Sequence, residues 1–257
     1  MIDWEQLFLL ELIVTRMTGF VLFSPIFGRR GIPGIVKGGL IMALSWAVIG
    51  TTDGGVPVPG TLLEHMLRLL LELAVGLALG YVMRLFFTVA QFGGEIIDAQ
   101  MGITMAQTYD ASSQANMTVS GSLLNILMIL IFFAENGHHT LLRLLLTSGE
   151  LVPYGGVSIG LPVAEQIVVF FLQCMLLSVK LGLPILAAEM LGELSMGILM
   201  KAIPQINAFV INMELKVIVG LVLLYLFLRP MTEFLLGVEQ DMLVAVEQML
   251  YLFSGQS

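Results

Sequence analysis

The chain is short of charge and of cysteine. Of its 257 residues, 12% are charged and 58% are hydrophobic, whereas a soluble domain has about a quarter charged and about half apolar residues. This composition is typical of an integral membrane protein. Cys174 is the only cysteine, which excludes an internal disulfide and a cysteine-based zinc site.

Basic residues and catalytic motifs are also scarce. The formal net charge is −8, so the basic surface that a nucleic-acid partner needs is absent. The sequence has no phosphate-binding Gly-Lys-Ser/Thr loop and no Gly-x-Ser-x-Gly elbow. His138 and His139 are adjacent and would point about 100° apart on a helix, which does not suit a shared metal ion. We therefore expect no enzyme activity, no cofactor and no metal.

The first apolar runs predict membrane-type helices. Leu7 to Phe27 is long enough to span a bilayer, and its charges Glu11 and Arg16 should face protein or water, or form pairs. The turn from Gly28 to Gly34 carries Arg29 and Arg30, with Lys37 close behind. By the positive-inside rule this turn is a cytoplasmic candidate.

A second apolar run, Ile35 to Ile49, precedes a long helical pattern from Leu62 to about Phe92. Within it Glu64, Arg68 and Glu72 are spaced four residues apart. This spacing predicts a ladder of pairs on one solvated or partner-facing helix face. His65, in the same stretch, is expected to make an ordinary polar contact.

The later apolar runs differ in length. Leu123 to Ala134 is too short to cross a bilayer simply and predicts a buried or half-spanning helix before a turn at Asn136-Gly137. Val163 to Leu186 is of spanning length, and so is Val210 to Leu228, which Arg229-Pro230 should close. Met231 to Phe253 has apolar residues at helical spacing, so residues 231–257 are predicted to form an amphipathic C-terminal helix and tail that docks on a partner helix.

A polar island, Gln91 to Met117, separates two of these apolar segments. Irregular polar backbone is tolerated at membrane depth only where it is buried in protein or lines a water-filled path. The island is therefore predicted to form or plug a passage. Met101, Met105 and Met117 flank it and could seal it, since thioethers adapt to irregular surfaces, although ordinary core packing explains most of the 17 methionines.

Three ionisable residues at membrane-like depth suggest a different function. Glu95, Asp98 and Lys180 could mark a proton or ion path, which would make the chain a proton-coupled transporter of small solutes. Lys180 could equally lie at a helix end, or pair with Glu189 or Glu193. Those two glutamates are four residues apart and repel unless a cation lies nearby.

Four blocks closely resemble the FliR family, the R subunit of the flagellar type III export gate, which is homologous to the T subunit of virulence injectisomes. They are FSPIFGRRGIPGIVKGGL (23–40), GEIIDAQMGITMAQTYDASSQANM (94–117), FFAENGHHTLLRLL (132–145) and AIPQINAFVI (202–211). The resemblance implies a single all-α unit over residues 1–257, built from kinked helical hairpins. The blocks look flagellar, and the injectisome homologue is the alternative.

The resemblance also implies a non-enzymatic role. The R subunit is expected to assemble with P and Q subunits into a channel for unfolded flagellar proteins, in contact with the A and B export proteins. This places the chain in the bacterial inner membrane, in the flagellar basal body. Much of the assembled gate is thought to stand above the bilayer, so that hydropathy overstates the number of spanning helices.

A plug is part of what the resemblance implies. In the family, a loop after the GEIIxxQMG block closes the channel, and here it corresponds to about Ala106 to Thr118. The family often has Asp-Pro where this chain has Asp110-Ala111, so one fixed φ angle is lost. The expected pore-facing residues are Gln107, Tyr109, Asp110, Ser112, Ser113 and Asn116.

Overall fold

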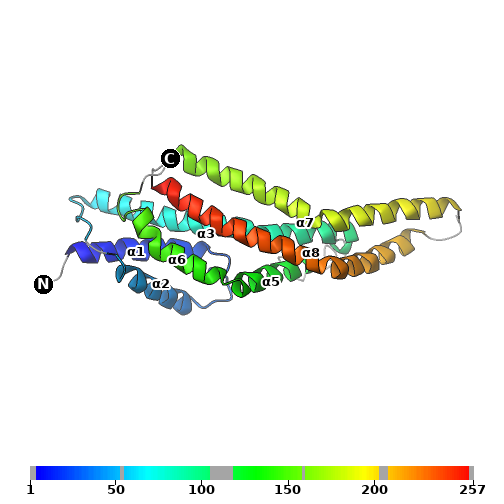
Figure 1. Ribbon diagram of the computed structural model, residues 1–257, viewed down its shortest axis with the longest axis horizontal. Helices are drawn as coiled ribbons and strands as arrows, with labels where there is room; N and C mark the ends of the chain where they lie inside the picture. Colours follow the sequence, from blue (N-terminus) through cyan, green and yellow to red (C-terminus); the bar gives the residue numbers. More distant parts are fainter. Residues whose placement is uncertain (1–3, 53–54, 105–117, 158–159, 203–207, 255–257) are drawn as a thin grey trace. The chain divides into compact units, whose positions relative to one another are not determined.

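The computed structural model describes residues 4–52, 55–104, 118–157, 160–202 and 208–254. Throughout these ranges the regular structure is helical, without a strand, so the prediction of an all-α fold is confirmed. The helices, in chain order, are α1 (Trp4–Phe23), α2 (Gly34–Ile49), α3 (Leu62–Met101), α5 (Val119–Ala134), α6 (Gly137–Leu151), α7 (Leu161–Ala202) and α8 (Ala208–Phe253) (Figure 1).

Long apolar helices dominate the described ranges. Four segments are long and apolar enough to cross a membrane: α1, α3, α7 and the part of α8 from Glu214 to Phe253. The sharply bent pair α5 and α6 could supply a fifth. Its bend lies at Asn136, which adopts a left-handed conformation with φ of 58°, as expected for an Asn-Gly turn. The short run before this turn is thus one arm of a bent helix pair, whose shape fits either a broken span or a re-entrant loop.

Three helices continue past the limits that the sequence predicts. Helix α3 extends to Met101, so the first part of the polar island is helical. Pro184 lies inside α7, and Pro230 lies inside α8, which it was wrongly expected to end. A proline removes one backbone hydrogen bond. Each of the two helices continues through its proline despite this loss.

The chain divides into two compact units. The first comprises Met1–Phe86, Phe132–Leu172 and Gln240–Ser257, and the second comprises Phe87–Ile131 and Gln173–Glu239. Helices α3, α5, α7 and α8 each contribute residues to both units. The single unit predicted for residues 1–257 stays a prediction.

In the first unit, α1 packs closely against α3. A methyl group on Gly80 would lie 2.9 Å from the carbonyl oxygen of Phe20, and one on Gly19 would lie 2.6 Å from that of Leu73. Small residues at these positions let the two backbones approach, as the spacing of Gly76 and Gly80 suggests.

The last turns of α8 also belong to the first unit. They bury one side, which includes Met242, Ala245, Met249 and Phe253, each at most 2% exposed. The intervening Asp241, Glu247 and Tyr251 remain exposed. This alternation is that of an amphipathic helix.

Candidate functional site

A residue inside the polar island is tied to a residue just after the island, within the second unit. The backbone N–H of Ser120 donates to Asp98 Oδ2 at 2.8 Å, and its hydroxyl donates to Asp98 Oδ1. Asp98 is fully buried and Ser120 is 3% exposed. The chain therefore leaves the end of α3 and returns to it at the start of α5.

The start of α5 is capped as well. Thr118 Oγ1 accepts a hydrogen bond from the N–H of Gly121 at 3.3 Å, which is the contact of an N-cap residue. The carboxylate of Asp98 lies beside the same first turn. There the backbone N–H groups have no acceptor within the helix, and the helix dipole favours negative charge. Asp98 thus satisfies a helix terminus and fixes where the island ends.

Glycines of the GEIIDAQMG region serve helix packing. The backbones of α3 and α5 meet at Gly94 and Gly121, where a methyl group on Gly94 would clash with the backbone of Gly121. On the next face, a methyl group on Gly93 would lie 2.7 Å from Leu181 of α7. These close approaches explain why a glycine-rich stretch is helical: neighbouring helices replace the side chains that it lacks.

Met101 closes the last turn of α3. It is fully buried, and a methyl group on Gly220 of α8 would lie 2.5 Å from its Cγ. The next residue, Gly102, has φ of +78°, a conformation that favours glycine. The island thus departs from a helix end that is held by α5 on one side and by α8 on another.

The other predicted island residues lie outside the described residues. These are Met105, Gln107, Tyr109, Asp110, Ser112, Ser113, Asn116 and Met117. The plug and the methionine seal around them stay predictions.

The three ionisable residues proposed for a proton path have separate surroundings. Asp98 is bound to Ser120. Glu95 is half-buried and accepts a hydrogen bond from Gln91 Nε2 at 3.0 Å, while Lys180 is exposed. Within the described part of the chain, no hydrogen bond or ion pair joins any two of them.

Glu95 does line an apolar groove between α3 and α7. The groove has a volume of about 420 Å³. Among the described residues that line it, the other polar side chain is Ser178, whose hydroxyl donates to the carbonyl of Cys174 at 2.8 Å. The lining residues are Phe92, Glu95, Ile96, Ala99, Met175, Ser178 and Val179.

Farther along α7, Glu193 forms an ion pair with Lys216 of α8. Lys216 supplies the nearby cation that offsets the repulsion between Glu189 and Glu193. Lys180 is therefore not needed as their partner.

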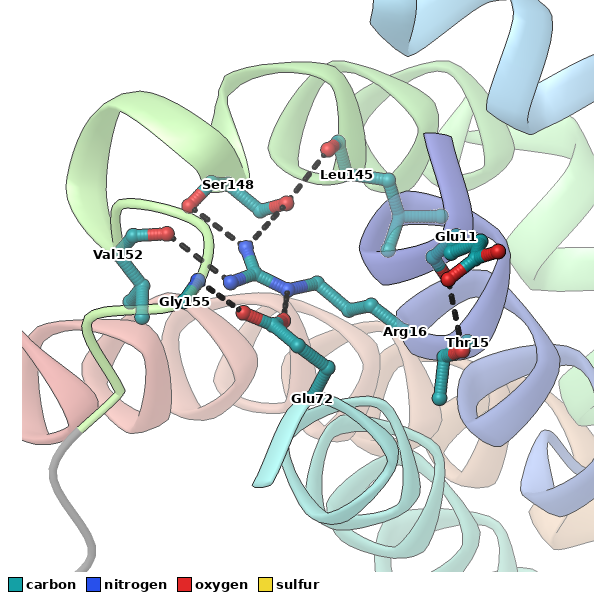
Figure 2. A network of polar contacts seen from close by, with 8 residues as sticks. All are labelled: Glu11, Thr15, Arg16, Glu72, Leu145, Ser148, Val152 and Gly155. Carbon is teal, nitrogen blue, oxygen red and sulfur yellow. Dashed lines mark hydrogen bonds and ion pairs between the residues drawn. The ribbon is translucent and has the colours of Figure 1, made fainter. Parts of the chain in front are cut away.

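A second polar site, in the first unit, is a fully buried ion pair (Figure 2). Arg16 Nε of α1 donates to Glu72 Oε2 of α3 at 2.6 Å, and both side chains are 0% exposed. Arg16 also donates to the carbonyl and hydroxyl oxygens of Ser148 at 3.1 and 3.3 Å and to the carbonyl of Val152 at 3.0 Å. The second oxygen of Glu72 accepts the N–H of Gly155 at 2.9 Å. The network joins α1 and α3 to the end of α6 and the following loop.

The ring of Tyr154, in the loop after α6, lies against the guanidinium group of Arg16. Its ring centroid lies 4.2 Å from Arg16 Cζ, a distance at which the ring face attracts a cation. Burial raises the pKa of Tyr154 above its usual value of 10.0, and the nearby charge of Arg16 opposes part of that rise. The phenol therefore stays neutral well beyond physiological pH.

The buried pair corrects the predicted ladder on α3. Arg68 Nη2 does pair with Glu64 Oε1 at 2.6 Å, and His65 Nε2 lies 3.2 Å from Glu11 Oε2, as an ordinary polar contact. Glu72, however, pairs with Arg16 instead of Arg68. Arg16 is buried, and leaving a buried charge without a partner would be strongly destabilising. The signal in the sequence was the presence of charges of opposite sign, Arg16 and Glu72, inside two separate apolar segments.

Comparison with known proteins assigns the family. Residues 7–242 match the family described as bacterial export proteins, family 1. The chain belongs to this family. Its FliR members include the flagellar biosynthetic protein FliR of Escherichia coli K12, which is 29% identical over 227 residues covering 87% of this chain and 84% of that protein.

Other FliR proteins are similar over comparable lengths. FliR of Bacillus subtilis 168 is 28% identical, covering 87% of this chain and 86% of the relative. FliR of Aquifex aeolicus VF5 is 26% identical and covers 96% of both chains. Membership in the FliR family agrees with the resemblance seen in the four sequence blocks, and with the apolar helices of a membrane protein.

Proposed function

We propose that this chain is a non-enzymatic subunit of the flagellar type III export gate in the bacterial inner membrane, within the flagellar basal body. It would assemble with P and Q subunits into the channel for unfolded flagellar proteins, and would contact the A and B export proteins. The segment from Ala106 to Thr118 would be the plug of the closed channel. The names of the relatives support a flagellar system over an injectisome.

The observation that carries the plug proposal is the tie between Asp98 and Ser120, which are 22 residues apart in sequence. A plug must be held firmly at its base while its middle can be displaced. Met101, Gly94 and Gly121 provide close helix contacts at that base.

A proton-coupled transporter is the alternative from another class. It would need Glu95, Asp98 and Lys180 to act along one path. The engagement of Asp98 with a helix terminus and the exposure of Lys180 favour the gate instead.

Affinity purification from the native host in mild detergent, followed by mass spectrometry, tests gate membership. We expect the P and Q subunits to be recovered with this chain in one stable particle. Recovery of the chain alone, or as a homo-oligomer, while other membrane complexes stay intact would reject the proposal. Transport by this chain alone, abolished in Lys180→Gln, would establish the transporter.

A scaffold that never lines the channel is distinguished by crosslinking. Cysteines placed at Ser112 and Ser113 are expected to crosslink to an export substrate arrested in the channel. Their failure to do so, in an assembled gate that holds such a substrate, would favour a scaffold.

A further inference from the structure

Helix α2 has two apolar sides, of which one is covered. Its buried side consists of Ile41, Leu44, Ser45 and Val48, and the helix packs against α1 and α6. On the opposite side lies an exposed stripe: Ile35 is 90% exposed, Met42 53% and Trp46 76%. At about 100° per residue, Ile35, Gly39, Met42 and Trp46 fall within about 60° of one another around the helix.

The stripe is interrupted by a gap. A methyl group added to Gly38 or Gly39 would have no atom within 4 Å. Between Ile35 and Met42 the helix therefore presents two glycines beside open space. A flexible hydrocarbon chain could approach the helix backbone there.

The charge next to the stripe has one sign. Between Glu11 and Asp53 the sequence contains no Asp or Glu, although the whole chain has a net charge of −8. Arg29 and Arg30 lie just before α2 and are exposed. Lys37 Nζ donates to the carbonyl of Gly28 at 3.0 Å, which ties the start of α2 to the turn that carries the two arginines.

We propose that this surface binds an anionic phospholipid, with the phosphate at Arg29 and Arg30 and an acyl chain along the stripe from Ile35 to Trp46. Cations beside an exposed apolar helix face are the combination that anionic membrane lipids attract. Trp46 suits the same site, since tryptophan favours the boundary between headgroups and hydrocarbon. The proposal does not depend on the export function.

Fluorescence quenching tests this site directly. The chain has two tryptophans, so Trp4→Phe leaves Trp46 as the only one. The full-length variant in mild detergent is titrated with brominated phosphatidylglycerol or with brominated phosphatidylcholine of the same acyl chains. We expect phosphatidylglycerol to quench Trp46 at concentrations at least about tenfold lower, since each basic residue near an anionic lipid strengthens binding severalfold.

Two further variants identify the groups involved. Arg29→Gln combined with Arg30→Gln should abolish the preference for phosphatidylglycerol, whereas Arg229→Gln, at an exposed arginine paired with Glu233, should leave it intact. Gly39→Leu should weaken quenching by both lipids because its side chain would occupy the open space beside the stripe. Equal quenching by the two lipids, or a preference that survives loss of Arg29 and Arg30, would overturn the proposal. Shielding of Trp46 from both lipids in the purified export gate would assign the stripe to a partner subunit.

Discussion

Asp98 and Ser120 are joined by two hydrogen bonds, one from the backbone N–H of Ser120 and one from its hydroxyl, in a fully buried position. Replacement of Asp98 with Ala would leave both donors buried without an acceptor. We expect a loss of about 1–3 kcal/mol in the free energy of unfolding, and faster proteolysis of the island. Thermal unfolding and limited proteolysis in mild detergent measure both effects.

Ser120→Ala is the milder variant, because it removes the hydrogen bond donated by the hydroxyl and keeps the one donated by the backbone N–H. Its effect should be smaller than that of Asp98→Ala. Ser195→Ala, at an exposed serine whose hydroxyl donates to the carbonyl of Leu191, should change little. Equal proteolysis of the island in wild type and in Asp98→Ala would show that the tie does not restrain it.

Arg16→Met should be among the most destabilising single changes in the first unit. It leaves the Glu72 carboxylate buried without its cation, which costs about 3–5 kcal/mol. Adding Glu72→Leu should not restore stability, because the carbonyl of Val152 and the N–H of Gly155 would still lack partners. Thermal unfolding of the single and the double variant measures both losses of stability.

Arg68→Met is the matched control for Arg16→Met. It breaks the partly exposed pair with Glu64, and pairs of this kind contribute about 0–1 kcal/mol. Similar losses in the two variants would contradict the assigned importance of the buried network.

Tyr154 should make stability depend on alkaline pH. Because burial raises its folded-state pKa above 10.0, its contribution is fully present below that value and is lost as pH rises through the folded pKa. Tyr154→Phe keeps the ring over Arg16 but cannot ionise. As pH increases beyond 10, the unfolding temperature of the wild type should therefore fall relative to that of Tyr154→Phe. A constant difference between the two proteins would argue against the raised pKa of Tyr154.

Gly220→Ala should disturb the end of α3. The added methyl group would lie 2.5 Å from Met101 Cγ, and overpacking of this kind costs about 1–3 kcal/mol. Gly237→Ala, also on α8 but with no atom within 4 Å of the added methyl group, should be neutral or stabilising by up to about 1 kcal/mol. Combining Gly220→Ala with Met101→Ala should give less than the sum of the two losses, because the residues touch. Additive losses in unfolding experiments would refute the contact.

Sequence patterns predicted the class of this protein well, because membrane-type composition and apolar run length depend on local sequence alone. They placed the turn at Asn136 and the ends of α2 for the same reason. They failed at Pro230, where α8 continues although the proline removes one hydrogen bond. They also failed at Glu72, whose local spacing favoured Arg68 although the true partner, Arg16, comes from another helix. The tie between Asp98 and Ser120 was equally invisible, since helical periodicity carries no information about contacts across the island.

The central claim is that the segment from Ala106 to Thr118 closes a protein-conducting channel. The most direct test is the ion permeability of cells whose export gate contains this chain with that segment shortened, measured beside cells with the full-length chain. We predict that the shortened segment makes the closed gate leak small ions. Unchanged permeability, in cells where the shortened chain still purifies with the P and Q subunits, would contradict the account.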